Sequence, residues 1–226
     1  MVRLMYKLKN KDMAKKIMFN DKYGLTKAVL EGKKTQTRRV VKAPKRYKNK
    51  DVNGFHVSED IATQEVLGIC MKDYDGSFIE EGDIYPKYKV GEIVAVAQSY
   101  RDAGIKPEYI VGYENYGTPI TAIQSPGWTN KMFVKPELMP HQIRITDVRV
   151  ERLQDISDED CLKDGISPMI VGCEYYVFTL IDKEKGRFLD YKKPREAYAA
   201  LIDKVSGKGT WESNPYVFVY DFELIK

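Results

Sequence analysis

A long alternating segment lies close to the C-terminus of this 226-residue chain. Large apolar side chains occupy every second position of it, at Tyr216, Phe218, Tyr220, Phe222 and Leu224. Side chains two residues apart share one face of a strand, so this pattern predicts a strand with one side packed inward. We therefore interpret these aromatic residues as part of the core, and not as a platform that stacks nucleobases.

Strand signals outnumber helix signals in the rest of the sequence. The segments 65–71 and 77–79 flank Asp73-Tyr74-Asp75-Gly76, and the Asp-Gly dipeptide is typical of a tight hairpin turn. Residues 93–97 are short and apolar on both faces, which predicts a buried central strand. The apolar positions change phase near Asp147, which predicts a bulge in the strand that contains it.

Two helices are predicted in the second half of the chain. The first begins at Pro194 and ends before Gly207, with apolar residues at helical spacing at Tyr198, Leu201, Ile202 and Val205. The second is a short helix over 158–164 with Ser157 as its N-cap. Asp164 lies in its last turn, where a carboxylate opposes the helix dipole. Helix stability therefore does not account for Asp164.

Length and composition favour one domain over residues 1–226, because the 43% of hydrophobic residues are enough for a single core. The polar or glycine-rich character of two stretches, near 42–87 and 103–135, predicts surface insertions. The net charge of +4 is too small for a protein that coats nucleic acid broadly, so any anion site is expected to be local.

The sequence provides no pattern that is typical of a metal or cofactor site. Three cysteines (Cys70, Cys161 and Cys173) and two histidines (His56 and His141) lack the spacing of zinc ligands or of a disulfide framework. Glycine-rich nucleotide loops are absent, so we expect no cofactor. No apolar run approaches the ~20 residues of a membrane span, which favours a cytoplasmic protein without a membrane partner.

The segment 32–39 is the strongest functional signal. It follows a short amphipathic helix and contains four cations and two hydroxyls, which are Lys33, Lys34, Arg38 and Arg39 with Thr35 and Thr37. If a strand begins at Lys34, then Lys34 and Thr37 converge only near the corner between helix and strand. Such residues resist burial, so we expect them to hold an anionic or polar group. The alternative is a solvated basic edge strand.

This segment resembles the signature of the ASCH family, a branch of the PUA-like superfamily. The matching residues are Gly32, Lys34, Thr35, Thr37 and Arg39. Further blocks are similar to long phage-type members, at residues 17–20, 90–96, 145–156 and 211–220. The resemblance implies an α+β fold, with a PUA-like mixed β-barrel, flanking short helices and surface insertions.

The resemblance also implies a site. ASCH members that act as amidohydrolases on N4-acetylcytidine use a lysine, a threonine and an acid, which correspond here to Lys34, Thr37 and, by the order of blocks, Asp164. In that mechanism Thr37 attacks the acetyl carbonyl, Lys34 takes its proton and Arg39 holds the oxyanion or a phosphate. This chain departs from the pattern at Asp164, where those enzymes have glutamate, and at Ala97-Gln98, where long members often have Arg-Glu.

Our first functional prediction is therefore a protein that binds RNA or a modified nucleoside. The predicted cleft contains Lys34, Thr37 and Asp164, and the predicted ligand-binding residues beside them are Thr35, Arg38, Arg39 and Tyr100, the last as a ring that stacks a base. The first alternative is an amidohydrolase that deacetylates N4-acetylcytidine-type substrates. The second is a protein-binding adaptor, which would have an exposed apolar patch and no polar cleft. The oligomeric state stays open.

Overall fold

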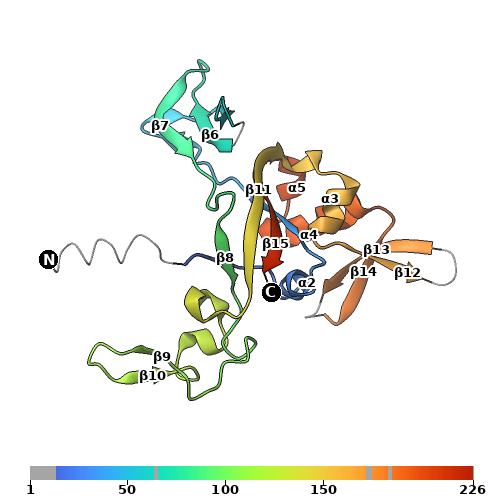
Figure 1. Ribbon diagram of the computed structural model, residues 1–226. Helices are drawn as coiled ribbons and strands as arrows, with labels where there is room; N and C mark the ends of the chain where they lie inside the picture. Colours follow the sequence, from blue (N-terminus) through green and yellow to red (C-terminus); the bar gives the residue numbers. More distant parts are fainter. Residues whose placement is uncertain (1–13, 64–65, 172–174, 183–184, 226) are drawn as a thin grey trace.

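The computed structural model describes residues 14–63, 66–171, 175–182 and 185–225 (Figure 1). A five-stranded sheet with the strand order β1-β8-β11-β15-β2 lies at its centre. Its strands are β1 (Lys16–Ile17), β2 (Gln36–Val40), β8 (Ile93–Val96), β11 (Gln142–Arg152) and β15 (Tyr216–Ile225). β1 runs parallel to β8, and the other neighbours pair antiparallel.

The long C-terminal strand and the bulge are both confirmed. β15 pairs with β11 along its whole length, and the register shifts between Ile145 and Asp147. The expectation that only one side of β15 packs inward is wrong, because Val217 and Val219 are fully buried as well as Tyr220. β15 is an interior strand between β11 and β2, and both of its faces pack into one core cluster.

The α+β class is confirmed, but the expected closed barrel is not seen. β1 and β2 form the two edges of the central sheet, and the described strands do not pair them with each other. β1 has only two residues and pairs with β8 alone, so it offers too short a ladder to close the sheet.

The helices gather beside the central sheet. They are α2 (Leu25–Leu30), α3 (Asp158–Lys163), α4 (Pro194–Ser206) and α5 (Thr210–Ser213). As predicted, α4 begins at Pro194 and has Gly207 as its C-cap, and the Ser157 hydroxyl caps α3 by accepting the Asp160 N–H at 3.0 Å. Figure 1 shows α3, α4 and α5 grouped on one side of β15. No described helix is long and apolar enough to cross a membrane.

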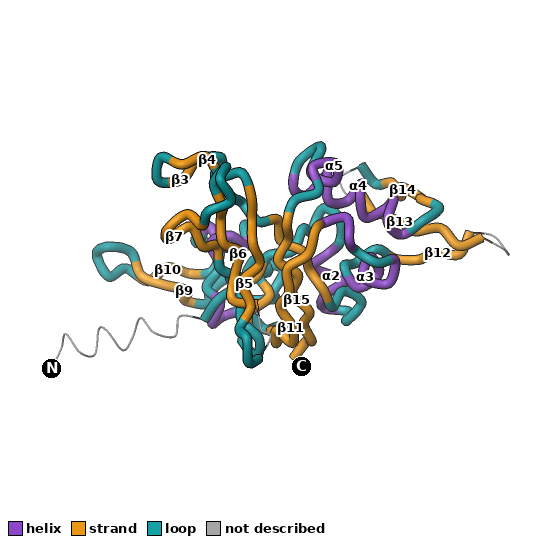
Figure 2. The backbone as a smooth tube through the Cα atoms, turned by 90° about the horizontal axis from the view of Figure 1, so that it is seen from above, coloured by secondary structure: helices purple, strands orange, loops and turns teal. Residues whose placement is uncertain are grey.

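The two segments expected as insertions carry small sheets of their own (Figure 2). The first contains the hairpin β3 (Arg46–Tyr47) and β4 (Lys50–Asp51) and the sheet of β5 (Gly54–Glu59), β6 (Val66–Lys72) and β7 (Phe78–Ile84). The predicted turn at residues 73–76 joins β6 and β7. The second contains β9 (Ile110–Tyr113), β10 (Pro119–Thr121) and the 3-10 turns η1 (Pro126–Trp128) and η2 (Lys131–Phe133).

The second insertion is more than a surface loop. Val111, Ala122 and Val134 are buried in a second core cluster that also contains Tyr100. Further turns follow at η3 (Pro136–Leu138) and η4 (Leu153–Asp155), and a three-stranded sheet of β12 (Ser167–Val171), β13 (Tyr175–Asp182) and β14 (Arg187–Tyr191) lies beside α4. Of the three cysteines, Cys70 and Cys161 are free thiols, and Cys173 lies outside the described residues.

Candidate functional site

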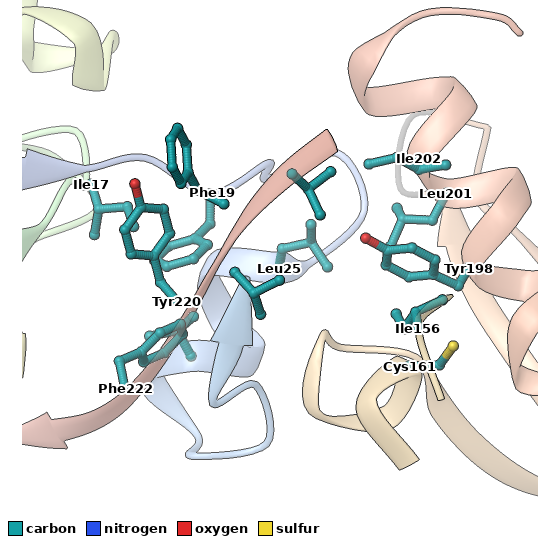
Figure 3. Close-up of a cluster of buried hydrophobic side chains, with 14 of the residues drawn as sticks. Ile17, Phe19, Leu25, Ile156, Cys161, Tyr198, Leu201, Ile202, Tyr220 and Phe222 are labelled. Atoms are coloured by element: carbon teal, nitrogen blue, oxygen red, sulfur yellow. The ribbon is translucent and has the colours of Figure 1, made fainter. Parts of the chain in front are cut away.

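A cavity of about 330 Å³, which we call the Lys34 cavity, opens between β2, α4 and the chain that leads into α2. One part of its wall is polar, with Lys34, Thr37, Arg38, Arg39 and Asp164. The other part is apolar, with Phe19, Leu25, Leu201, Ile202 and Val205. Figure 3 shows Leu25 facing the side chains of α4 across this region. The cavity therefore combines charged, hydroxyl and aliphatic groups in one small volume.

The chain turns sharply before it enters β2, and this turn places Lys34 at the cavity. Gly32 has a φ of +70°, a left-handed conformation that glycine adopts without steric cost. The backbone N–H groups of Lys33 and Lys34 both donate to the Ala28 carbonyl at the end of α2. The strand begins at Gln36, two residues later than expected, so Lys34 belongs to the corner rather than to the strand.

Lys34 and Asp164 form a buried ion pair across 130 residues of sequence. The Lys34 side chain is 2% exposed, and its Nζ lies 2.5 Å from Asp164 Oδ1. The same ammonium donates to the Gln36 carbonyl at 2.7 Å and to the Asp164 carbonyl at 2.5 Å, so fixed acceptors use its three protons. Burial lowers the pKa of Lys34 from its usual value, and the Asp164 carboxylate opposes this shift.

Arg38 binds the other oxygen of the Asp164 carboxylate. Its guanidinium is fully buried and lies 3.0 Å from Asp164 Oδ2, and 3.1 Å from both Glu151 Oε2 and Asp160 Oδ2. It also donates to the Gln36 side chain, and its Nε is buried without a partner among the described residues. We predicted that Arg38 binds ligand, but the fold uses its N–H groups to hold carboxylates.

The ion-pair network continues from Asp160 to a second arginine, Arg149. Arg149 pairs with Glu151 at 2.6 Å, with Asp147 at 3.0 Å and with Asp221. Its Nη2 also lies 3.6 Å from Asp160, so two arginines share that carboxylate. The ion pairs therefore join β2, β11, β15 and α3 behind the polar wall of the cavity, and they position Asp164 independently of any ligand.

Asp160 gives a pH-dependent test of this network. Burial alone would raise the pKa of Asp160, but Arg38 and Arg149 bring it below its usual value of 3.8. A carboxyl whose pKa is lower when folded stabilises the protein above the unfolded pKa, and this stabilisation is lost as the pH falls through the folded value. We expect Asp160→Asn to lower the free energy of unfolding at pH 7. When the pH falls below about 4, the stability of this variant should decrease less than that of the natural protein.

The measurement is urea unfolding at a series of pH values between 2 and 7, and the control is Asp158→Asn. Asp158 is exposed in the same first turn of α3. Equal acid dependence in Asp160→Asn, Asp158→Asn and the natural protein would contradict the role assigned to Asp160.

Tyr198 is a site residue that sequence reasoning missed. Its helical spacing with Leu201 marks it as a core residue, and its ring is indeed 2% exposed. It nevertheless lines the Lys34 cavity together with Asp164. Burial raises the pKa of Tyr198 well above its usual value, and the Asp164 carboxylate adds to the shift. Its hydroxyl therefore stays a neutral donor beside the buried acid.

The other predicted site residues divide between the cavity and the scaffold. Thr37 and Arg39 both line the cavity, and Arg39 Nη2 donates to the Met18 carbonyl at 2.7 Å. Thr35 is not among the lining residues. Its backbone joins two elements, since its N–H donates to the Lys163 carbonyl and its carbonyl accepts the Phe222 N–H.

Tyr100 lies in a different part of the molecule. It is 1% exposed in the second core cluster, and its hydroxyl accepts the Lys135 N–H at 3.0 Å. The space that a Cβ would occupy at Gly127 lies 2.6 Å from the Tyr100 ring, so the chain packs directly against the ring. The hypothesis that this ring stacks a base is therefore wrong, because the insertion 103–135 covers it.

The described residues contain no group of three or more His, Cys, Asp or Glu side chains that could hold a metal ion. His141 instead lies with its Nδ1 at 2.8 Å from the Gln98 side chain. The carboxylates near the cavity are satisfied by arginine and lysine, so the chemistry available there is that of ammonium, hydroxyl and carboxylate groups.

Comparisons with known proteins do not assign a family. No family model matches the chain, and no curated protein matches it. Among solved structures, the crystal structure of protein EF3133 from Enterococcus faecalis V583, described with the family model DUF984, is similar with a TM-score of 0.37 and 11% identity. The match covers 99% of this chain and 88% of that one. Similarity at this level supports no inference about function, and the ASCH resemblance stays a prediction.

Proposed function

We propose that the Lys34 cavity binds a nucleoside, either as part of RNA or as a free modified nucleoside. The observation that carries this proposal is the meeting of Lys34, Thr37 and Asp164 beside an apolar wall in one cavity. A volume of about 330 Å³ lies at the small end of the range for ligand pockets. It suits one base with its ribose and excludes a duplex or a folded peptide segment.

The two parts of the wall match the two parts of a nucleoside. Aliphatic side chains of α4, such as Leu201 and Ile202, provide flat contact for the face of a base. Thr37 supplies a hydroxyl that both donates and accepts, which suits a base edge or a ribose hydroxyl. The adaptor alternative expects no polar cleft, so this cavity disfavours it. We retain the PUA-like architecture as a finer part of the same proposal.

Removing the Thr37 hydroxyl is expected to weaken nucleoside binding. Valine has the shape of threonine without its hydrogen-bonding group, so Thr37→Val should weaken binding roughly 3- to 10-fold, as for the loss of one hydrogen bond. The measurement is calorimetric titration with the four ribonucleosides and N4-acetylcytidine. Thr35→Val is the matched control, because Thr35 does not line the cavity. If none of the five nucleosides binds, the proposed function is refuted.

The second candidate is the amidohydrolase. It is favoured by one observation: burial lowers the pKa of Lys34, the proposed base, and the proposed nucleophile Thr37 shares its cavity. A neutral amine is required to accept the threonine proton, so a lowered pKa brings that state closer to neutral pH. Against it, the Lys34 protons point to Gln36 and Asp164, and catalysis requires one of these contacts to be exchanged for Thr37.

A further inference from the structure

A second hollow of about 330 Å³ adjoins the Lys34 cavity, and we call it the basic groove. Its cations are Lys16, Arg39, Lys42 and Lys87, and its rings include Tyr85 and Tyr88. None of the described residues that line it is an aspartate or a glutamate. In a chain with a net charge of only +4, four cations without a carboxylate form a local positive field.

The two hollows form one continuous surface. Met18, Arg39, Val40 and Lys42 line both of them. Arg39 is held at the junction, since it donates to the Met18 carbonyl at 2.7 Å and its guanidinium lies 5.8 Å from the centre of the Phe19 ring. A guanidinium has five N–H groups, so donors remain for an anion that lies between the hollows.

Two cations of the groove, Lys16 and Lys87, lie close enough to interact. Burial lowers the pKa of Lys16, and the charge of Lys87 lowers it further, although Glu137 opposes the shift. Lys16 is already committed, because its Nζ donates to the carbonyls of Met132 and Val134 at 2.6 Å. Lys42 and Lys87 are exposed. The exposed ammonium groups of Lys42 and Lys87 are therefore the ones that an anion can reach from solvent.

The backbone beneath these cations is fixed in place. The Lys87 N–H donates to the Tyr220 hydroxyl at 2.9 Å, and the Tyr88 hydroxyl donates to the Lys16 carbonyl at 2.9 Å. These bonds tie the segment before β8 to β15 and to β1. The groove is thus preorganised, and binding an anion requires only the ordering of lysine side chains.

We propose that the basic groove holds a phosphate group of the ligand whose base occupies the Lys34 cavity. The preferred ligand is then a nucleotide, free or within single-stranded RNA, and not an unphosphorylated nucleoside. This inference depends on the proposed nucleoside binding and adds the class of ligand. Arg39 and Lys42 line both hollows and lie where both parts of the ligand meet, whereas Lys87 contacts the phosphate alone.

The test compares each ribonucleoside and N4-acetylcytidine with its 5′- and 3′-monophosphates by calorimetric titration. One monophosphate of a nucleoside that binds is expected to bind roughly 10-fold or more tightly than that nucleoside. The variant Lys87→Ala should lose most of this difference and keep its affinity for the nucleoside, because Lys87 lines the basic groove and not the Lys34 cavity. Lys45→Ala is the control, since Lys45 is an exposed lysine outside both hollows.

A single-stranded oligoribonucleotide distinguishes the chain from the free nucleotide. If RNA is bound, affinity should decrease with salt, and the slope of log affinity against log salt concentration should become less negative by roughly 0.7 when Lys87 is removed. Monophosphates that bind no more tightly than nucleosides would overturn the groove proposal and leave the nucleoside site intact. Failure of nucleosides and monophosphates alike would overturn both proposals.

Discussion

The variant Asp164→Ala is expected to lower the free energy of unfolding by about 3–5 kcal/mol. The substitution removes the carboxylate that pairs with Lys34 at 2.5 Å and with Arg38 at 3.0 Å, both of them buried. A buried charge that loses its partner bears the full cost of desolvation, whereas an exposed charge is resolvated by water. Urea unfolding followed by tryptophan fluorescence at pH 7 measures the loss.

The matched control for this prediction is an exposed ion pair of the central sheet, between β11 and β15. Glu223 and Arg144 lie 2.9 Å apart with about half of each side chain exposed. Glu223→Ala is expected to change the stability by less than about 1 kcal/mol. Similar small losses in Asp164→Ala and Glu223→Ala would contradict the buried-pair interpretation.

A double-mutant cycle separates the pair from its surroundings. If Lys34 and Asp164 act as one unit, Lys34→Met combined with Asp164→Ala costs less than the sum of the two single variants. Breaking a buried ion pair is costly, but replacing both partners by apolar residues is often tolerated. Stability alone therefore does not explain why charged residues occupy this position.

The residues that line the polar wall of the cavity could be predicted from the sequence, but the ion-pair network behind them could not. Lys34 and Thr37 belong to one short segment, and the dipole argument identified Asp164 as a residue that helix stability does not require. The partners of Arg38 could not be predicted in this way. Glu151 and Asp160 come from distant segments. The pairing of β2 with β15, and of β15 with β11, brings Glu151 to the guanidinium, and the packing of α3 beside β2 brings Asp160.

The differences between the expectations and the structure have related physical causes. Tyr100 was interpreted as an exposed ring because the length of the following insertion does not reveal that it folds back over the ring. The prediction of Tyr198 as a core residue is confirmed, but helical spacing does not show that its side chain also lines a cavity. The barrel was expected from the resemblance, and the two-residue length of β1 is a feature of pairing that a local pattern does not show.

The prediction with the largest effect on activity concerns deacetylation of N4-acetylcytidine. If the cavity performs this reaction, Thr37→Ala should reduce kcat/KM by roughly 1,000-fold or more, because removing a nucleophile eliminates the covalent route. Thr37→Ser keeps a hydroxyl at the same position and should retain most of the activity. Release of cytidine and acetate, followed by chromatography, measures turnover, and Thr35→Val serves as the control because Thr35 lies outside the cavity lining.

The pH dependence of this reaction identifies the base. Lys34 accepts the threonine proton only as a neutral amine, so kcat/KM should rise with pH through the folded pKa of Lys34, which burial holds below 10.5. Lys34→Met should remove that rise together with the activity. Turnover that survives Thr37→Ala would exclude Thr37 as the nucleophile. An unmodified protein that binds N4-acetylcytidine without releasing acetate would assign the cavity to binding alone.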